Sequence, residues 1–68
     1  MKARTRELVD DKLGYWVNRV RRAHNAEAAL DPYMKALGAV ELLEVADLIT
    51  LAEAEFWRSK LADVFVGI

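Results

Sequence analysis

Few residues of this 68-residue sequence have side chains suited to catalysis. It holds one histidine, His24, and no cysteine, which removes thiol chemistry and cysteine-based zinc sites. Ser59 has no histidine near it in sequence, and no glycine-rich phosphate loop is present. His24 falls at an expected helix end, where the helix dipole favours it. We therefore predict that the protein is not an enzyme, with no catalytic residue, no metal ligand and no cofactor.

Basic residues gather in the first third of the chain. Lys12, Tyr15, Arg19 and Arg22 follow one another at spacings of three and four, which places them on one face of a helix, whereas Arg21 points elsewhere. Basic side chains interleaved with an aromatic ring can bind phosphate, although a plain solvated face has the same pattern. The isoelectric point near 5.7 argues against tight DNA binding by the protein alone. We expect contact with DNA only indirectly or weakly.

A second candidate surface combines acids with leucines. Glu44 and Asp47 lie beside Leu48 and Leu51 in sequence. An apolar patch rimmed by acids is typical of a protein interface, but the leucines are equally consistent with burial under a helix connection. The residues predicted to bind a partner are Arg19, Arg21, Arg22, Glu44, Asp47, Leu48 and Leu51.

Charge is divided unevenly along the chain. Residues 1–24 contain seven basic and three acidic residues, and residues 25–68 contain three basic and eight acidic ones. The two halves either attract each other within the fold or offer oppositely charged faces to partners. No segment is long and apolar enough to span a bilayer, and none has the pattern of a signal peptide. We expect a soluble, cytoplasmic protein with no membrane contact.

Periodicity predicts an all-α fold of three to four helices in a single domain, residues 1–68. The first helix is expected over 5–23, with Gly14 permitting close approach of another backbone. The second is expected over 26–37, as one helix or as a turn and a helix starting at Pro32, and Gly38 ends it. The third is expected to be the longest, over 40–64, although Thr50 to Glu53 has the pattern of a capping box that would divide it.

The helical faces also predict a core and a leftover apolar stripe. Val40, Leu48 and Leu51 interrupt the polar face of the expected third helix, which predicts a homodimer or a partner-bound form. The residues expected to meet in one core are Trp16, Val20, Ile49, Phe56 and Leu61.

Several stretches resemble the Hha/YmoA family of nucleoid-associated regulators. The arginine-rich stretch from Trp16 to Ala23 is similar to that family's first-helix motif. The segments beginning Glu41-Leu-Leu, Ala54-Glu-Phe and Lys60-Leu-Ala-Asp are similar to its third helix. The resemblance implies binding to the oligomerisation domain of H-NS-like silencers, with the arginines at 19, 21 and 22 as charged contacts.

The sequence departs from the family pattern at one contact position. The acid that the family uses for partner contact falls on Thr50, and Asp47 is the nearest acid. The linker between the motifs is also shorter, and the family's tryptophan-containing tail is missing. The leading hypothesis is a small regulatory adaptor that binds an H-NS-like DNA-organising protein and modulates transcription. The alternative is a phage- or plasmid-encoded inhibitor that binds and blocks a host protein.

Overall fold

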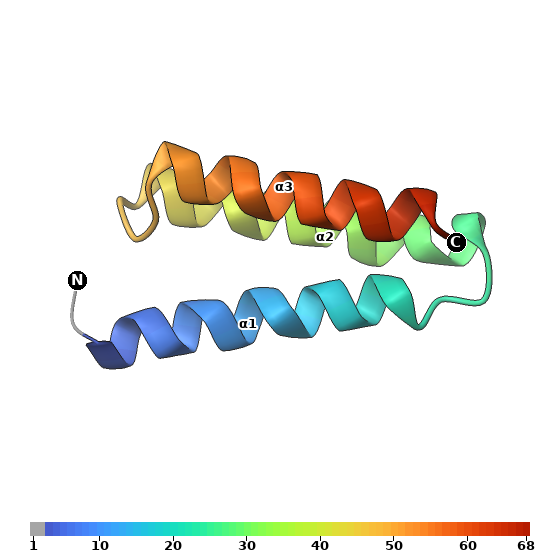
Figure 1. Ribbon diagram of the computed structural model, residues 1–68, viewed down its shortest axis with the longest axis horizontal. Helices are drawn as coiled ribbons and strands as arrows, with labels where there is room; N and C mark the ends of the chain where they lie inside the picture. The colour runs from blue at the N-terminus through green and yellow to red at the C-terminus, as the bar shows by residue number, and fades with distance from the viewer. Residues whose placement is uncertain (1–2) are drawn as a thin grey trace.

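The computed structural model describes residues 3–68 and contains three helices in that range (Figure 1). They are α1 (Ala3–Arg21), α2 (Ala26–Val45) and α3 (Leu51–Val66). Successive helices run in opposite directions, and all three lie side by side along the long axis of the molecule (Figure 1). The described residues contain no strand, so the expected all-α fold with three helices is confirmed.

The first helix follows the predicted periodicity. Val9, Leu13, Val17 and Val20 are buried along one face of α1, and Trp16 packs at the edge of the core. The helix ends after Arg21, and Asn25 caps α2 by accepting a 2.8 Å hydrogen bond from the backbone N–H of Ala28.

The second helix is much longer than expected, because neither Pro32 nor Gly38 ends it. Asn25 sets the start of α2 before Pro32, and the helix continues through Gly38 to Val45. Ala36 and Val40, on either side of the glycine, are both completely buried. Their burial offsets the cost of about 1 kcal/mol for a glycine inside a helix.

A turn over residues 46–50 separates α2 from α3, so the single helix expected over 40–64 is wrong and the capping-box alternative is right. Asp47 has a positive φ of 58°, the left-handed conformation that ends helices. Thr50 Oγ1 accepts from the Glu53 N–H at 3.1 Å, and Glu53 Oε1 accepts from the Thr50 N–H at 2.9 Å. The third helix is consequently the shortest of the three.

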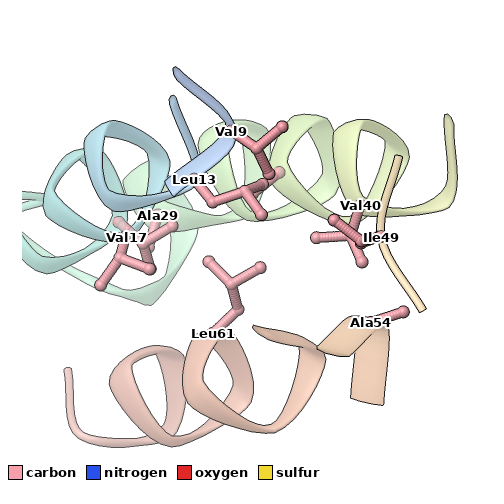
Figure 2. Close-up of a cluster of buried hydrophobic side chains, with 10 residues drawn as sticks. Val9, Leu13, Val17, Ala29, Val40, Ile49, Ala54 and Leu61 are labelled. Carbon is pink, nitrogen blue, oxygen red and sulfur yellow. The ribbon is translucent and has the colours of Figure 1, made fainter. Parts of the chain in front are cut away.

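All three helices contribute to one core. Val20, Ile49 and Leu61 are buried as expected, and Trp16 packs against them from the side. Phe56 was expected in the core, but it is 57% exposed, and the neighbouring Trp57 packs against the core instead. Figure 2 shows Leu61 of α3 pointing toward the buried residues of α1 and α2. The buried set is Val9, Leu13, Val17, Val20, Ala29, Ala36, Val40, Ile49, Ala54 and Leu61.

Polar and aromatic contacts join α3 to its neighbours. Arg6 of α1 forms an ion pair with Glu53, and Glu44 of α2 accepts a 2.7 Å hydrogen bond from the Arg58 guanidinium. The rings of Tyr33 and Phe65 stack with their centroids 4.5 Å apart. Gly14 makes no close approach, since nothing lies within 4 Å of the position that a Cβ would take there.

Candidate protein interaction surfaces

The structure brings two of the three predicted arginines together on α1. Arg19 and Arg22 line a shallow hollow of about 490 Å³ together with two acids, Asp10 and Asp11, and with other residues of α1. Its walls come from the solvent side of α1 and from Arg22 directly after it, so the hollow is a surface feature and not an enclosed pocket. Such a surface suits contact with a macromolecule better than enclosure of a small ligand.

The arginines are held by neutral neighbours. Arg19 Nη1 donates to the Tyr15 hydroxyl at 3.5 Å, and Arg21 Nη1 donates to Asn18 Oδ1 at 3.3 Å. Lys12 lies 5.4 Å from the centre of the Tyr15 ring, within the range of a cation–π contact. None of these cations forms an ion pair with a carboxylate in residues 3–68, which leaves their donors available to a partner.

Arg21 belongs to a different surface. It lines two hollows on the seam between α1 and α3, one with Trp57 and Lys60 and the other with His24 and Asp63. The three arginines therefore do not form one patch, because successive residues of a helix point about 100° apart.

The two acidic candidates, Glu44 and Asp47, also lie in different surroundings. Glu44 is partly buried and is engaged by Arg58, so it joins α2 to α3 and is not a free acid. Asp47 is exposed in the turn between these helices and makes none of the ion pairs found in the described part of the chain. Of the two, Asp47 is the residue placed to meet a partner.

The predicted apolar stripe is not continuous. Val40 is completely buried, and Leu48 is half-buried in the turn, where its backbone N–H donates to the Leu43 carbonyl at 2.9 Å. Leu51 alone is well exposed, at 59%, at the start of α3. The apolar surface at this end of the molecule therefore consists of Leu51 with the exposed Leu42 and Val45 of α2.

An exposed apolar face on α2 was missed by the sequence analysis. Leu30, Met34, Leu42 and Val45 are all at least half exposed, and Gly38 lies in the middle of their row. They are separated in turn by four, eight and three residues, and these spacings place them on one face of a helix. The signal was readable in the sequence, but only if α2 was assumed to continue through Gly38.

A groove between α1 and α3 was also missed. A hollow of about 560 Å³ is lined by Phe56 and Trp57, with Arg6, Glu53 and Lys60 among the charged residues around it. The two aromatic rings meet edge to face at 5.4 Å, and Lys60 lies 5.7 Å from the Phe56 ring centre. Phe56 was assigned to the core because the helix was expected to be continuous.

The charged groups at this groove affect each other's ionisation. The hydrogen bond from the Thr50 backbone, followed by that from Arg6, lowers the pKa of Glu53 below its ordinary value. The same Glu53 side chain raises the pKa of Arg6. Both shifts favour the charged forms of the pair at neutral pH.

Neither a metal site nor a membrane span emerges from the described residues. Residues 3–68 contain no group of three or more His, Asp or Glu side chains placed to hold a metal ion. None of the three helices in this range has the length and apolar character needed to cross a bilayer. Comparison with protein-family models, curated proteins and solved structures gives no match in any of the three.

Proposed function

We propose that this protein is a small regulatory adaptor that binds an H-NS-like DNA-organising protein and modulates transcription in the cytoplasm, acting by binding and not by catalysis. The observation that carries the proposal is the exposure of Arg19, Arg21 and Arg22, none of which forms an ion pair within residues 3–68. Arg19 and Arg21 donate hydrogen bonds only to neutral groups. Unpaired arginines on a rigid helix suit an acidic protein surface or phosphate.

Charge favours contact with DNA through the partner. The whole chain has a formal net charge of −1, so Arg19 and Arg22 give a local positive surface on a nearly neutral protein, with Arg21 on a separate surface. Such a surface steers association without supplying strong DNA affinity of its own. The adaptor would add basic groups to a complex that already holds DNA.

The second working surface lies at the opposite end of the molecule. Arg22 follows the C-terminal end of α1, whereas Asp47 lies in the turn between α2 and α3 and Leu51 begins α3, at the other end of the molecule (Figure 1). An adaptor uses both surfaces, with the arginines meeting acidic groups or phosphate and Asp47 meeting a basic group. An inhibitor that blocks one host protein needs only one of them.

Binding to a purified H-NS-like protein, at low and high salt and with and without DNA, tests the proposal. Replacing Arg19, Arg21 and Arg22 together with Gln should lower the association rate at low salt by about tenfold, because electrostatic steering is lost. The free energy of unfolding should change by no more than about 0.5 kcal/mol per exposed site. Equal affinity of the wild type and the triple variant at low salt would overturn the proposal.

Two further variants separate the surfaces. Asp47→Asn with Leu51→Gln alters the turn surface and leaves the arginines unchanged. Loss of affinity in both variants supports an adaptor with two contacts, and loss in the arginine variant alone supports a one-faced inhibitor. Glu55→Gln, an exposed change on α3 outside both surfaces, is the matched control and should bind like the wild type.

A further inference from the structure

The outward face of α2 carries large exposed apolar side chains in both halves of the helix, together with acids. Leu30 is 50% exposed, Met34 58%, Leu42 69% and Val45 75%. This row spans about 22 Å at 1.5 Å per residue. Large apolar side chains in a row of this length on a small protein mark an interaction surface. We call this surface, with the acids among its apolar residues, the α2 face; the acids are Glu27, Asp31 and Glu41.

The acids of the α2 face are only partly neutralised within the chain. Lys35 pairs with Asp31 at 3.1 Å, but Glu27 and Glu41 make none of the ion pairs present in residues 3–68. The face as a whole is therefore negative. A second negative α2 face brought against it would be repelled, which disfavours a symmetric dimer through α2.

The outward face of α1 has the opposite charge. Leu8 is 60% exposed and Tyr15 46% exposed on the side of α1 that faces away from the core. Basic residues outnumber the two acids on this side of the helix, Glu7 and Asp11, so the side is positive overall. We call this surface the α1 face; it consists of Arg4, Leu8, Lys12, Tyr15, Arg19 and Arg22.

We infer that the α1 face of one copy of this chain docks on the α2 face of a second copy. The two faces match in charge and in length, since Leu8 to Arg22 spans nearly the same distance as Leu30 to Val45. Basic residues of one copy meet Glu27 and Glu41 of the other, while the apolar side chains of both are covered. Pairing of identical faces places like charges together and is disfavoured.

Gly38 provides space for this contact. Nothing lies within 4 Å of the position of a Cβ at Gly38, and the residue lines an open hollow of about 270 Å³ with Glu41, Leu42 and Val45. The hollow is large enough to receive an aromatic ring, and Tyr15 is the aromatic residue of the α1 face. Its hydroxyl can remain at the wet edge of the contact.

The arrangement predicts open assembly. Because the α1 and α2 faces point outward from different helices, one copy can use both at once. A contact between unlike faces leaves a free face at each end, so assembly continues beyond the dimer unless the rotation closes a ring. This inference shares Arg19 and Arg22 with the proposed function, but its test uses the purified protein without a second partner, so the two can fail separately.

Charge reversal on each face provides the test, with assembly of the full chain followed by sedimentation velocity over a concentration series. The wild type should grow beyond the dimer with concentration, and less so when salt is raised from about 0.02 M to about 0.5 M. Arg19→Glu with Arg22→Glu should remain monomeric, because its α1 face becomes acidic. Glu27→Lys with Glu41→Lys should also remain monomeric, because its α2 face becomes basic.

Mixing the two variants at equal concentration is the decisive step. Only pairing of unlike faces predicts that two monomeric variants assemble when combined, since each supplies the charge that the other lost. Glu55→Lys with Asp63→Lys gives the same net charge as the α2 variant but leaves both faces unchanged. It should assemble like the wild type, which excludes net charge as the cause.

Three outcomes overturn the inference. A wild type that stays monomeric at all concentrations excludes the contact. Association of the α1 variant alone, with loss in the α2 variant, indicates a symmetric dimer through α2. Two monomeric variants that stay monomeric on mixing exclude the proposed pairing of faces. A wild type that assembles but does not bind an H-NS-like protein would support the inference and count against the proposed function alone.

Discussion

The inner and outer faces of α2 are both apolar, but they are built from side chains of different size. Ala29, Ala36 and Val40 lie inward and are completely buried. Met34 and Leu42 lie outward and are more than half exposed. Since α2 packs against both other helices, its inner side must admit two neighbours closely, and small side chains allow this. The larger apolar residues of α2 that pack against the core are only partly buried, so size as well as position decides which residues of α2 are completely buried.

The sharpest test of this difference uses the same substitution on both faces. Val40→Ala should lower the free energy of unfolding by about 2 kcal/mol, because it removes buried methyl groups and leaves a cavity. Val45→Ala, at a position that is 75% exposed, should change it by less than about 0.5 kcal/mol. Urea denaturation of both variants measures the two values. Equal losses would mean that the outer face is covered in the folded protein.

Sequence periodicity was sufficient for α1 because its buried residues form one narrow stripe, although α1 packs against both other helices as α2 does. Val9, Leu13, Val17 and Val20 recur at spacings of three and four, and all four are buried. The capping residues Asn25 and Thr50 were also recognisable, because each acts on backbone groups three residues away.

The errors in α2 and α3 have physical causes. Gly38 is a local signal for a helix end, but burial of residues on both sides of it outweighs that preference. A continuous helix over 40–64 places Phe56 on the same side as Ile49, seven residues earlier. The turn over 46–50 removes that phase relation, so Ala54, Trp57 and Leu61 face the core and Phe56 points to solvent.

The candidate surfaces were predictable to different degrees. Helix spacing predicted that Arg19 and Arg22 lie on the same face, and in the structure both line the same hollow. The engagement of Glu44 by Arg58 joins residues fourteen positions apart on two helices, and only the fold reveals it. Local spacing therefore locates charges on one helix, whereas the neutralisation of a charge depends on tertiary packing.

The turn that ends α2 offers the next test, because it separates the α2 face from α3. Thr50→Ala removes the hydroxyl that accepts from the Glu53 N–H and should cost about 1 kcal/mol. Thr50→Ser keeps the acceptor and is the matched control, with little expected loss. Thermal unfolding followed by circular dichroism measures both. A loss as large for Ser as for Ala would assign the effect to the methyl group and not to the cap.

A smaller effect of opposite sign is expected at the middle of the α2 face. Gly38 has a helical backbone and open space around its Cβ position, so Gly38→Ala should stabilise the protein by about 0.5 to 1 kcal/mol. Gly14→Ala in α1 should give a similar gain for the same reason. Chemical denaturation of the two variants tests whether both glycines are free of packing constraints. Destabilisation at Gly38 alone would show that the α2 face is already packed against something.

The smallest effect concerns the ion pair between Arg6 of α1 and Glu53 of α3, which joins these two helices. The pKa of Glu53 is lowered in the folded protein by the Thr50 backbone and by Arg6. The contribution of Glu53 to stability is therefore fully present above the unfolded pKa of about 4.3 and is lost as the pH falls through the folded pKa.

Glu53→Gln keeps the side-chain acceptor of the capping box but loses the charge that pairs with Arg6. The variant should melt below the wild type at pH 7, and the two melting temperatures should converge as the pH falls through the folded pKa of Glu53, because the wild-type carboxylate then becomes neutral as well. Glu55→Gln, at an exposed acid of the same helix that makes no ion pair within residues 3–68, should show no such convergence. A difference in melting temperature between wild type and Glu53→Gln that does not change with pH would show that the carboxylate charge contributes nothing to holding α1 and α3 together.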